Sequence, residues 1–510
     1  MVRVEPARYG LRGGLALQPS LPEPALPFGE APVPPLLILP LQSRGGEAAL
    51  PQVQVGERVL RGQCIARLAG PWDAALHASS SGTVIAIEPR LVALHAGILT
   101  APCILIRTDG ADSALPHLPP CDPAVMDRMA VLQRLAEAGV VGLGGAVFST
   151  AAKLACAVAA EVDTLILNAA ECEPHIRCDE ALLAHQAERI AQGARAIATF
   201  LGKPQVLIGL KETLDSAPLV AALTAVGLNE ARIVQVPARY TAGAEDLLIR
   251  LLTGREVPRG ALPTAIGCVC LNVATVAAAG DALLRGEPLI SRIVTVSGPG
   301  LAGAANLVVR LGTPVADLTA ACGGYTDQAS QLILGGPMMG LALPDDALPV
   351  TKASQALWVA SAAQGQPPRP VQPCIRCGAC VEVCPVRLLP QQLHAYARSG
   401  DTAALAAHAL DVCIECGCCD AVCPSQIPLV QTFRAAKTEL AHAQGQDHRA
   451  AWLKGHFEAR EARLEQLKIQ RENRYQSARD QLRREDPRAR LARLKARRQT
   501  AGTPPKEGAP

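Results

Sequence analysis

Two cysteine-rich stretches near the C-terminal end constrain the fold of this 510-residue chain more than any other feature. They read CIRCGACVEVCP at 374–385 and CIECGCCDAVCP at 413–424, so each is C-x2-C-x2-C-x3-C followed by proline. A structural zinc site normally uses two C-x2-C pairs separated by a longer arm. Three cysteines at i, i+3 and i+6 instead wrap one segment around one iron–sulfur cubane, and the fourth cysteine reaches the other cubane. The repeat therefore predicts two [4Fe–4S] clusters, with paired zinc sites as the alternative.

The crossed pattern also predicts which thiolates share a cluster, because the cysteine before each proline is too far along the chain to close its own cubane. Cys418 interrupts the second motif and is predicted to be a bystander. The predicted ligands are Cys374, Cys377, Cys380 and Cys423 for the first cluster, and Cys413, Cys416, Cys419 and Cys384 for the second.

The number of cysteines and the first residues of the chain indicate the cellular compartment. The chain has 18 cysteines and starts MVRVEPARYGLRGG, without an apolar segment behind a basic start, so we expect no signal peptide and a reducing environment. The longest uncharged run that resembles a membrane span, 260–280, contains proline, glycine, asparagine and many alanines. We predict a buried strand followed by a packed helix there, rather than a lipid-spanning helix.

Charge is unevenly distributed along the chain. Residues 449–510 contain 17 Lys/Arg and 8 Asp/Glu, a net charge of +9, whereas residues 1–448 carry −6. Aromatic residues are only 3% of the chain, which argues against base-stacking nucleic-acid modules, so we expect no nucleic-acid partner. The basic C-terminal helix has few apolar positions, which predicts a solvated face, with contact to anionic lipid or acidic partner subunits as the alternative.

The pattern of residue types changes along the chain and divides it into successive parts. Short strand-like runs with Pro and Gly turns come first, then alternating helices and strands typical of a largely parallel α/β sheet. A charged helix near the end is interrupted at Pro487, after which we expect disorder. The predicted parts are a β domain (1–120), an α/β domain (121–287), a small β-rich domain (288–345), a linker (346–372), the double cysteine domain (373–437), and the charged helix with its basic tail (438–510).

A second redox site is expected upstream of the cysteines. Such clusters pass one electron at a time, a nicotinamide delivers two as hydride, and a flavin converts between the two modes. The glycine-rich segment 142–148 opens a predicted helix that carries Lys153, and Glu171 and Glu173 lie at the end of the strand segment LILNAAECEP. Glycine loops at helix starts and the carboxyl ends of parallel strands are where such folds bind anionic ligands. The alternatives are a loop packed tightly for structural reasons and solvated carboxylates.

These motifs resemble a known flavoprotein. GLGGAVFSTAAKL followed by LNAAECEP is similar to the FMN- and NADH-binding fold of the complex I flavoprotein subunit, where the pattern is RGGAGFP, a Lys and NADEGEP. YTAGAE and LNVAT fall where that family has its later GEE and NNVET elements. The resemblance implies a site for FMN and NAD(H) lined by Gly142, Gly144, Gly145, Lys153, Asn168, Glu171, Glu173, Gly243, Glu245, Asn272 and Thr275.

The chain departs from that pattern at several positions. Val147 stands where the family has glycine, and its side chain would crowd a flavin ring laid on the loop. Ser149 stands in place of proline, and Ala170, Ala244 and Ala274 stand in place of acidic residues. These positions bear on whether FMN is retained.

The order of motifs over roughly 10–435, ending in the double cysteine repeat, resembles the RnfC (RsxC) family of the Rnf (Rsx) ion-translocating electron transport complex. The N-terminal part is similar to lipoyl and biotinyl barrel-sandwich modules, although no Lys precedes Lys153 to be modified. The resemblance implies a multidomain α/β plus α+β protein. Its parts are a β barrel-sandwich hybrid, a complex I flavoprotein-like α/β domain, a small β-grasp domain, a bacterial two-cluster ferredoxin-like domain and a C-terminal helix.

The family implies a function. Its members are peripheral subunits on the cytoplasmic side of the bacterial inner membrane, in a complex that exchanges electrons between NADH and ferredoxin while moving Na+ or H+. The implied partners are the other subunits of that complex, ferredoxin, NAD(H) and the membrane surface. Two alternatives remain open: a soluble flavin/iron–sulfur reductase similar to cobalamin reductase, and a non-catalytic electron-wire or scaffold subunit without flavin.

Overall fold

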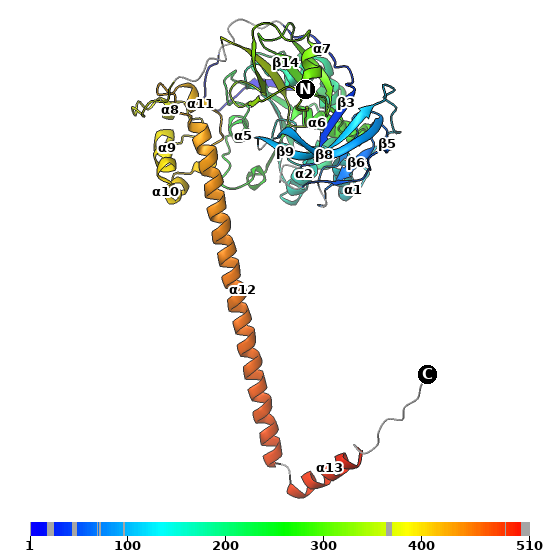
Figure 1. The fold of residues 1–510 in the computed structure, drawn as a ribbon, viewed down its shortest axis with the longest axis vertical. Coiled ribbons are helices and arrows are strands. Elements are labelled where there is room, and N and C mark those ends of the chain that lie inside the picture. Colours follow the sequence, from blue (N-terminus) through cyan, green and yellow to red (C-terminus); the bar gives the residue numbers. More distant parts are fainter. Residues whose placement is uncertain are drawn as a thin grey trace. The chain divides into compact units, whose positions relative to one another are not determined.

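The computed structural model describes residues 2–17, 25–42, 48–68, 70, 73–94, 97–363, 370–484 and 486–500. The chain divides into two compact units, Met1–Arg434 and Ala435–Pro510. The first unit contains the strands β1 to β18 and both cysteine motifs, and runs from blue to orange in Figure 1.

An N-terminal β domain is built from two antiparallel sheets. The larger has the order β3-β9-β8-β5, and β8 and β9 form a long hairpin in which Gly82 pairs with Thr108 and Leu94 with Gly97. Its core comes from strand residues such as Leu37, which pairs with Ile106. The strands are β3 (Leu36–Pro40), β5 (Arg58–Val59), β8 (Gly82–Leu94) and β9 (Gly97–Thr108), and the smaller sheet has β4 (Leu50–Pro51), β6 (Cys64–Arg67) and β7 (Leu76–His77).

The first thirty residues differ from the predicted 1–120 domain, because they supply strands to two other sheets. Strand β1 (Arg3–Pro6) pairs in parallel with β12, and β2 (Phe28–Glu30) pairs in parallel with β15. Each adds to the edge of its sheet and so covers backbone groups that would otherwise be unpaired.

The central sheet is parallel throughout and has the order β1-β12-β11-β10-β13. Its inner strands, β10 (Thr164–Ala169), β11 (Gln205–Lys211) and β12 (Arg232–Val236), and the edge strand β13 (Cys268–Asn272) are largely buried, as expected for a sheet covered on both faces. The helices are α1 (Arg128–Glu137), α2 (Thr150–Ala159), α3 (Cys178–Phe200), α4 (Ala217–Ala225), α5 (Glu245–Thr253) and α6 (Val273–Gly280), with short helices η1 (Pro263–Ile266) and η2 (Asp281–Arg285).

Helices α3 and α6 cross closely because Gly193 lies at the crossing. A Cβ at Gly193 would lie 2.0 Å from the carbonyl oxygen of Val276, so no larger residue fits without moving the helices. The run 260–280 forms η1, β13 and α6, which confirms the prediction of a strand followed by a packed helix. No helix in the described part of the chain is long and apolar enough to cross a membrane.

A third, mixed sheet has the order β17-β16-β18-β14-β15-β2. The prediction of a linker at 346–372 is corrected here, because β18 lies inside the sheet between β14 and β16. The signal for β18 is the buried apolar run ALWVAS, and residues 364–369 lie outside the described part. The elements are β14 (Ser291–Ser297), β15 (Ala305–Arg310), α7 (Val315–Ala321), β16 (Ala329–Leu334), β17 (Leu341–Leu343) and β18 (Ala356–Ser361).

The two cysteine motifs fold alike. Each places a glycine in the left-handed region, Gly378 with φ +84° and Gly417 with φ +76°, immediately before a four-residue helix. These glycines allow the sharp turn that brings the first three cysteines of a motif to one side. The elements are α8 (Ala379–Glu382), α9 (Pro390–Ser399), α10 (Thr402–Ala407), η3 (Leu410–Val412) and α11 (Cys418–Ala421).

The C-terminal helices differ from the sequence prediction in extent. Helix α12 spans Leu429–Arg484, so it begins before the predicted charged segment, and α13 spans Pro487–Thr500. Pro487 does end the first helix, as predicted, but the expected disorder after it is wrong for residues 487–500. Proline is well suited to the first helical position, and the Arg, Leu, Ala and Lys residues that follow are good helix formers. Residues 501–510 lie outside the described part.

Candidate cofactor sites

The first predicted cluster set lies around one cavity. Cys374, Cys377, Cys380 and Cys423 all line it, together with Gln391 and His394 from α9. Cys374 and Cys377 are exposed, whereas Cys380 and Cys423 are partly buried. The Sγ atom of Cys380 lies 3.6 Å from the amide oxygen of Gln391.

The second predicted set is gathered more deeply. Burial, and then the neighbouring charges of Asp420, Cys416, Cys413 and Cys384, raise the pKa of the Cys419 thiol. Cys416 and Cys419 are each only 8% exposed, so this set is more enclosed than the first. The chain therefore brings Cys384 to the second motif and Cys423 to the first, which is the arrangement that the crossed pattern predicts.

The distances between the sulfur atoms help to distinguish a zinc site from an iron–sulfur cubane. In neither described set of four do three sulfur atoms come within 4.8 Å of one another. Four thiolates around one zinc ion, with Zn–S bonds of about 2.3 Å, would lie only about 3.8 Å apart. Neither set is therefore spaced for a single zinc ion, and four thiolates are the donor set that a [4Fe–4S] cluster uses. The assignment of individual ligands stays a prediction.

The glycine loop presents unused donors. Within the described residues, the backbone N–H groups of Gly144, Gly145 and Ala146 donate no hydrogen bond. Leu143 N donates to the hydroxyl of Thr275 at 2.8 Å, which fixes the loop to α6, and Gly145 adopts φ +101°. Successive free N–H groups form a concave site for an anionic ligand, so the loop fits a flavin phosphate or ring carbonyl.

Val147 adopts φ +51°, a left-handed conformation that a β-branched residue rarely takes and that glycine takes without cost. Val147 thus holds a backbone conformation for which glycine is the usual residue. The Val147 side chain packs against the main hydrophobic core and lines an apolar cavity with Phe148 and Ala152. It therefore has a packing site inside the protein.

Several predicted cofactor residues contact one another. Lys153 pairs with Glu245 at 2.7 Å, and Asn168 donates to the carbonyl of Gly243 at 2.8 Å. A Cβ at Gly243 would lie 2.0 Å from the carbonyl oxygen of Ala170, so the close approach requires glycine. These contacts join α2 and the carboxyl end of β10 to the start of α5.

Asn272 caps helix α6 and reaches the start of α3. Its Oδ1 accepts from Ala274 N at 2.9 Å, and its amide donates to Asp179 at 2.6 Å. Asn272 also lies against the glycine loop, since a Cβ at Gly144 would be 3.3 Å from the Asn272 Cβ. The loop, β13, α3 and α6 therefore meet at this residue.

The carboxylate of Glu171 is buried and accepts hydrogen bonds from the protein itself. One oxygen accepts from Asp179 N at 3.2 Å and from the Cys178 thiol at 3.1 Å, and the other accepts from Glu180 N at 3.4 Å. Burial raises the pKa of Glu171, and burial together with the Glu171 charge raises the pKa of Asp179 to about 8. The start of α3 favours charge on Glu171, so Asp179 holds a proton at neutral pH.

Glu173 connects the α/β domain to the third sheet. Its Oε1 accepts from Met338 N at 2.8 Å and from Met339 N at 3.0 Å. Burial raises the pKa of Glu173. Glu171 and Glu173 thus lie at the strand end as predicted, but both carboxylates bind backbone groups of the chain itself.

Tyr240 joins the predicted flavin region to the second cysteine set, and the sequence did not single it out as a site residue. Its hydroxyl donates to the carbonyl of Cys416 at 2.5 Å, and the residue is 3% exposed. It packs in a hydrophobic cluster with Cys416, Cys418 and Cys172. Burial is the main cause that raises the pKa of the Tyr240 phenol, so it stays a hydrogen-bond donor.

Three further contacts hold the cysteine region in place. A Cβ at Gly13 would lie 2.6 Å from the carbonyl oxygen of Cys384, and Gly14 N donates to the carbonyl of Val383 at 2.8 Å. Arg259 pairs with Asp411 through Nε at 2.9 Å. The glycine pair in LRGGL was the one sequence signal for this close approach.

Family models match four parts of the chain. They are described as the RnfC barrel sandwich hybrid domain (13–111), the Nuo51 FMN-binding domain (135–281), the SLBB domain (293–342) and the 4Fe-4S dicluster domain (370–427). These matches confirm the predicted fold class. They also support FMN and two [4Fe–4S] clusters as the cofactors, as the sequence predicts.

Curated relatives match over most of the chain, and each is named as the subunit designated C of an ion-translocating oxidoreductase complex. The Pseudomonas aeruginosa protein is 45% identical over 90% of this chain, which spans 59% of that relative's length. The Rhodobacter capsulatus protein is 44% identical over 82% of this chain and 80% of its own length. The Yersinia enterocolitica protein is 40% identical, covering 89% of this chain and 65% of its own length.

Among solved structures, a crystal structure of an NAD+-reducing [NiFe]-hydrogenase covers 57% of this chain and 52% of its own, with 22% identity and a TM-score of 0.41. That similarity is too low to support a conclusion. The curated relatives are sufficient, because the Rhodobacter protein is matched over most of both chains. Together with the fold and the paired cysteine sites, they show that this chain belongs to the RnfC family of ion-translocating oxidoreductase complexes.

Proposed function

We propose that this protein is the peripheral subunit that passes electrons between NAD(H) and the other redox partners of an ion-translocating oxidoreductase complex. FMN would accept or donate two electrons, and two [4Fe–4S] clusters carry them singly. Ferredoxin and the membrane subunits are the proposed partners, and the cytoplasmic face of the bacterial inner membrane is the proposed location.

The contact between Tyr240 and Cys416 carries this proposal. It joins the strand-end region, where Asn168 and Gly243 lie, to the backbone of a predicted ligand of the second cluster. Tyr240, Cys416 and Cys418 are buried there, and the partly buried Cys172 and Met338 pack against them. This packed contact connects the two proposed redox centres within one folded unit.

Other residues of the chain have further proposed roles in binding FMN and in transferring protons and electrons. The free N–H groups of the glycine loop would bind the anionic part of FMN, and Thr275 would hold the loop in position. The protonated Asp179 beside Glu171 would hold a proton near the flavin. Exposed Cys374 and Cys377 place the first cysteine set toward solvent, so we propose that electrons pass to or from partners there.

Anaerobic purification followed by iron, sulfide and flavin analysis tests the proposal. We expect about eight irons, eight sulfides and one FMN per chain, and two reduced cluster signals in electron paramagnetic resonance after NADH is added. Zinc in place of iron, or clusters that NADH leaves oxidised while dithionite reduces them, would refute it.

Cysteine variants test the crossed ligation. Cys384→Ser should damage the cluster held by Cys416 and Cys419, and Cys423→Ser should damage the other. Cys418→Ala is the matched control, since Cys418 is buried in the same motif but is predicted to bind no iron. Loss of the opposite cluster in either serine variant would contradict the assignment.

The two alternatives predict different outcomes. A soluble reductase similar to cobalamin reductase would reduce cobalamin as an isolated chain and would not co-purify with integral membrane proteins. A non-catalytic electron wire would contain both clusters but no flavin, and NADH would not bleach its absorbance. Val147 and Ala170 motivate the second alternative, while the free N–H groups of the glycine loop argue against it.

A further inference from the structure

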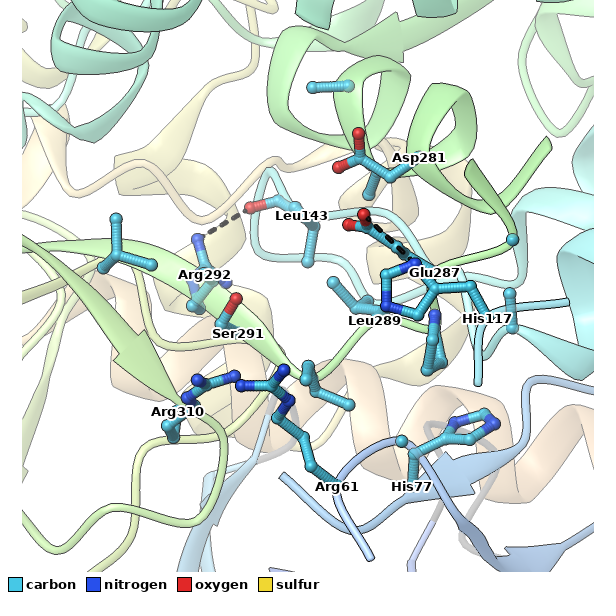
Figure 2. Close-up of a pocket in the computed structure, with 18 of the residues that line it drawn as sticks. Arg61, His77, His117, Leu143, Asp281, Glu287, Leu289, Ser291, Arg292 and Arg310 are labelled. Atoms are coloured by element: carbon cyan, nitrogen blue, oxygen red, sulfur yellow. Dashed lines mark hydrogen bonds and ion pairs between the residues drawn. The ribbon is translucent and has the colours of Figure 1, made fainter. Parts of the chain in front are cut away.

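A cavity of about 520 Å3 lies where three parts of the first unit meet, and Figure 2 shows it. Arg61 and His77 come from the N-terminal β domain, Leu143 from the glycine loop, and Arg292 and Arg310 from β14 and β15. Its size is within the range of about 300–1,000 Å3 that is typical of small-molecule sites. None of the predicted FMN, NAD(H) or cluster residues lines it, but Leu143 of the glycine loop and Asp179 do, so this cavity adjoins the proposed flavin site without containing its predicted residues.

Two arginines in the cavity share one carboxylate. Arg61 and Arg310 both pair with Asp112, the latter at 3.0 Å, and Ser80 donates to the same carboxylate at 2.7 Å. Figure 2 draws the two guanidinium groups next to each other. One carboxylate neutralises only one of them, and two guanidiniums offer ten N–H donors in all. A positive charge and several donors are therefore left for a planar oxyanion.

His77 supplies an unpartnered acceptor at another part of the wall. Its side chain is buried, at 6% exposure, and its Nδ1 has no hydrogen-bond partner among the described residues. Burial lowers the pKa of His77 to about 3, so the imidazole is neutral, and it also has a hydrogen bond with the Glu137 backbone. A buried polar atom without a partner is uncommon, and a ligand N–H or O–H group would satisfy it.

The wall between these polar groups is apolar. Leu182 comes from α3, Ala277 and Ala278 from α6, Leu289 from the segment before β14, and Val308 from β15. The two small alanines leave room for a flat body against the helix. The cavity thus combines an anion site, one acceptor and an apolar surface.

We propose that this cavity binds a small organic oxyanion that has a flat apolar body and an N–H donor. The oxyanion lies between Arg61 and Arg310, the body lies against α6, and the donor reaches His77. The cavity also includes Arg292, which donates to the carbonyl of Leu143 at 3.1 Å. A ligand in this cavity would therefore lie beside the residue that holds the glycine loop.

Calorimetric titration of the anaerobically purified, cofactor-loaded chain tests the proposal. The probes are adenosine monophosphate, which carries a phosphate group, and indole-3-acetate, which carries a carboxylate group. Adenosine and indole, which lack these anionic groups, are their counterparts. We expect at least one anionic probe to bind with a Kd below about 1 mM, and at least about tenfold more tightly than its counterpart. Binding of the first indicates a phosphate ligand and binding of the second a carboxylate ligand. If neither anionic probe binds, the proposal is wrong.

Variants locate the binding. Arg310→Gln should weaken the probe by about tenfold or more, because a guanidinium–oxyanion pair is lost. Arg90→Gln is the matched control, since Arg90 pairs with Glu88 away from the cavity. Ala278→Met fills the cavity from α6 while keeping every arginine, and it should also weaken binding, with thermal unfolding confirming that it folds. If Arg310→Gln and Ala278→Met both bind the probe as tightly as the wild-type protein, the proposal is wrong.

Discussion

The proton on Asp179 gives the most quantitative prediction. Asp179 is 4% exposed in the first turn of α3, where its carboxyl group accepts only the amide of Asn272 at 2.6 Å among the described residues. Glu171 already accepts the backbone N–H of Asp179, and its charge lies beside the Asp179 carboxyl. Burial and this charge raise the pKa of Asp179 from 3.8 to about 8, so the folded protein binds one proton that the unfolded chain releases between these values.

The raised pKa fixes the direction of the pH dependence. Stabilisation by the bound proton is complete below the unfolded pKa and is lost as the pH rises through about 8. Between pH 5 and pH 7 the difference is close to one proton, so the free energy of unfolding should fall by about 3 kcal/mol at most. Asp179→Asn cannot release a proton and should remove this loss.

Urea unfolding followed by circular dichroism, at pH 5 and pH 7 under anaerobic conditions, measures the effect. The wild-type midpoint should drop with pH, and the Asp179→Asn midpoint should change much less. Asp215→Asn is the control, because Asp215 is an aspartate outside this cluster that accepts the backbone N–H of Ala217 in a surface turn. Equal losses in wild type and Asp179→Asn would show that Asp179 is ionised in the folded protein and would refute the reasoning.

Three further substitutions test the contacts that position the sites. Thr275→Val leaves the Leu143 N–H without its acceptor and should weaken FMN binding by about tenfold, whereas Thr275→Ser should not; fluorescence titration with FMN measures this. Tyr240→Phe removes the donor to Cys416 and should lower the free energy of unfolding by about 1–2 kcal/mol, and an unchanged urea midpoint would contradict the contact. Glu173→Ala leaves two N–H groups of the 338–339 turn unpaired and should cost about 2–3 kcal/mol, while Glu173→Gln keeps the acceptor oxygen and should cost less, as thermal unfolding can compare.

Local patterns in the sequence were enough to predict most elements and the number of clusters. Short strand-like runs separated by Pro and Gly turns predicted the β8 and β9 region, and alternating helices and strands predicted the parallel sheet. The spacing of three cysteines, closed by a cysteine before proline, depends only on short stretches of backbone, so it could be recognised without the fold. The prediction failed where the local signal was weak. The ALWVAS strand was assigned to a linker, and the charged segment after Pro487 was assigned to disorder, although its residues favour a helix.

The sequence alone was enough to recognise the chemical groups: two four-thiolate sets, a glycine loop before a helix, and two carboxylates after a strand. The way in which these groups meet follows from the tertiary structure. Tyr240 and Cys416 are 176 positions apart, and Gly13 approaches Cys384 across most of the unit. The carboxylates of Glu171 and Glu173 turned inward to backbone donors that no spacing rule connects to them. Such contacts depend on the packing of whole domains, which hydrophobic burial and complementary shape decide, and these quantities are not periodic along the chain.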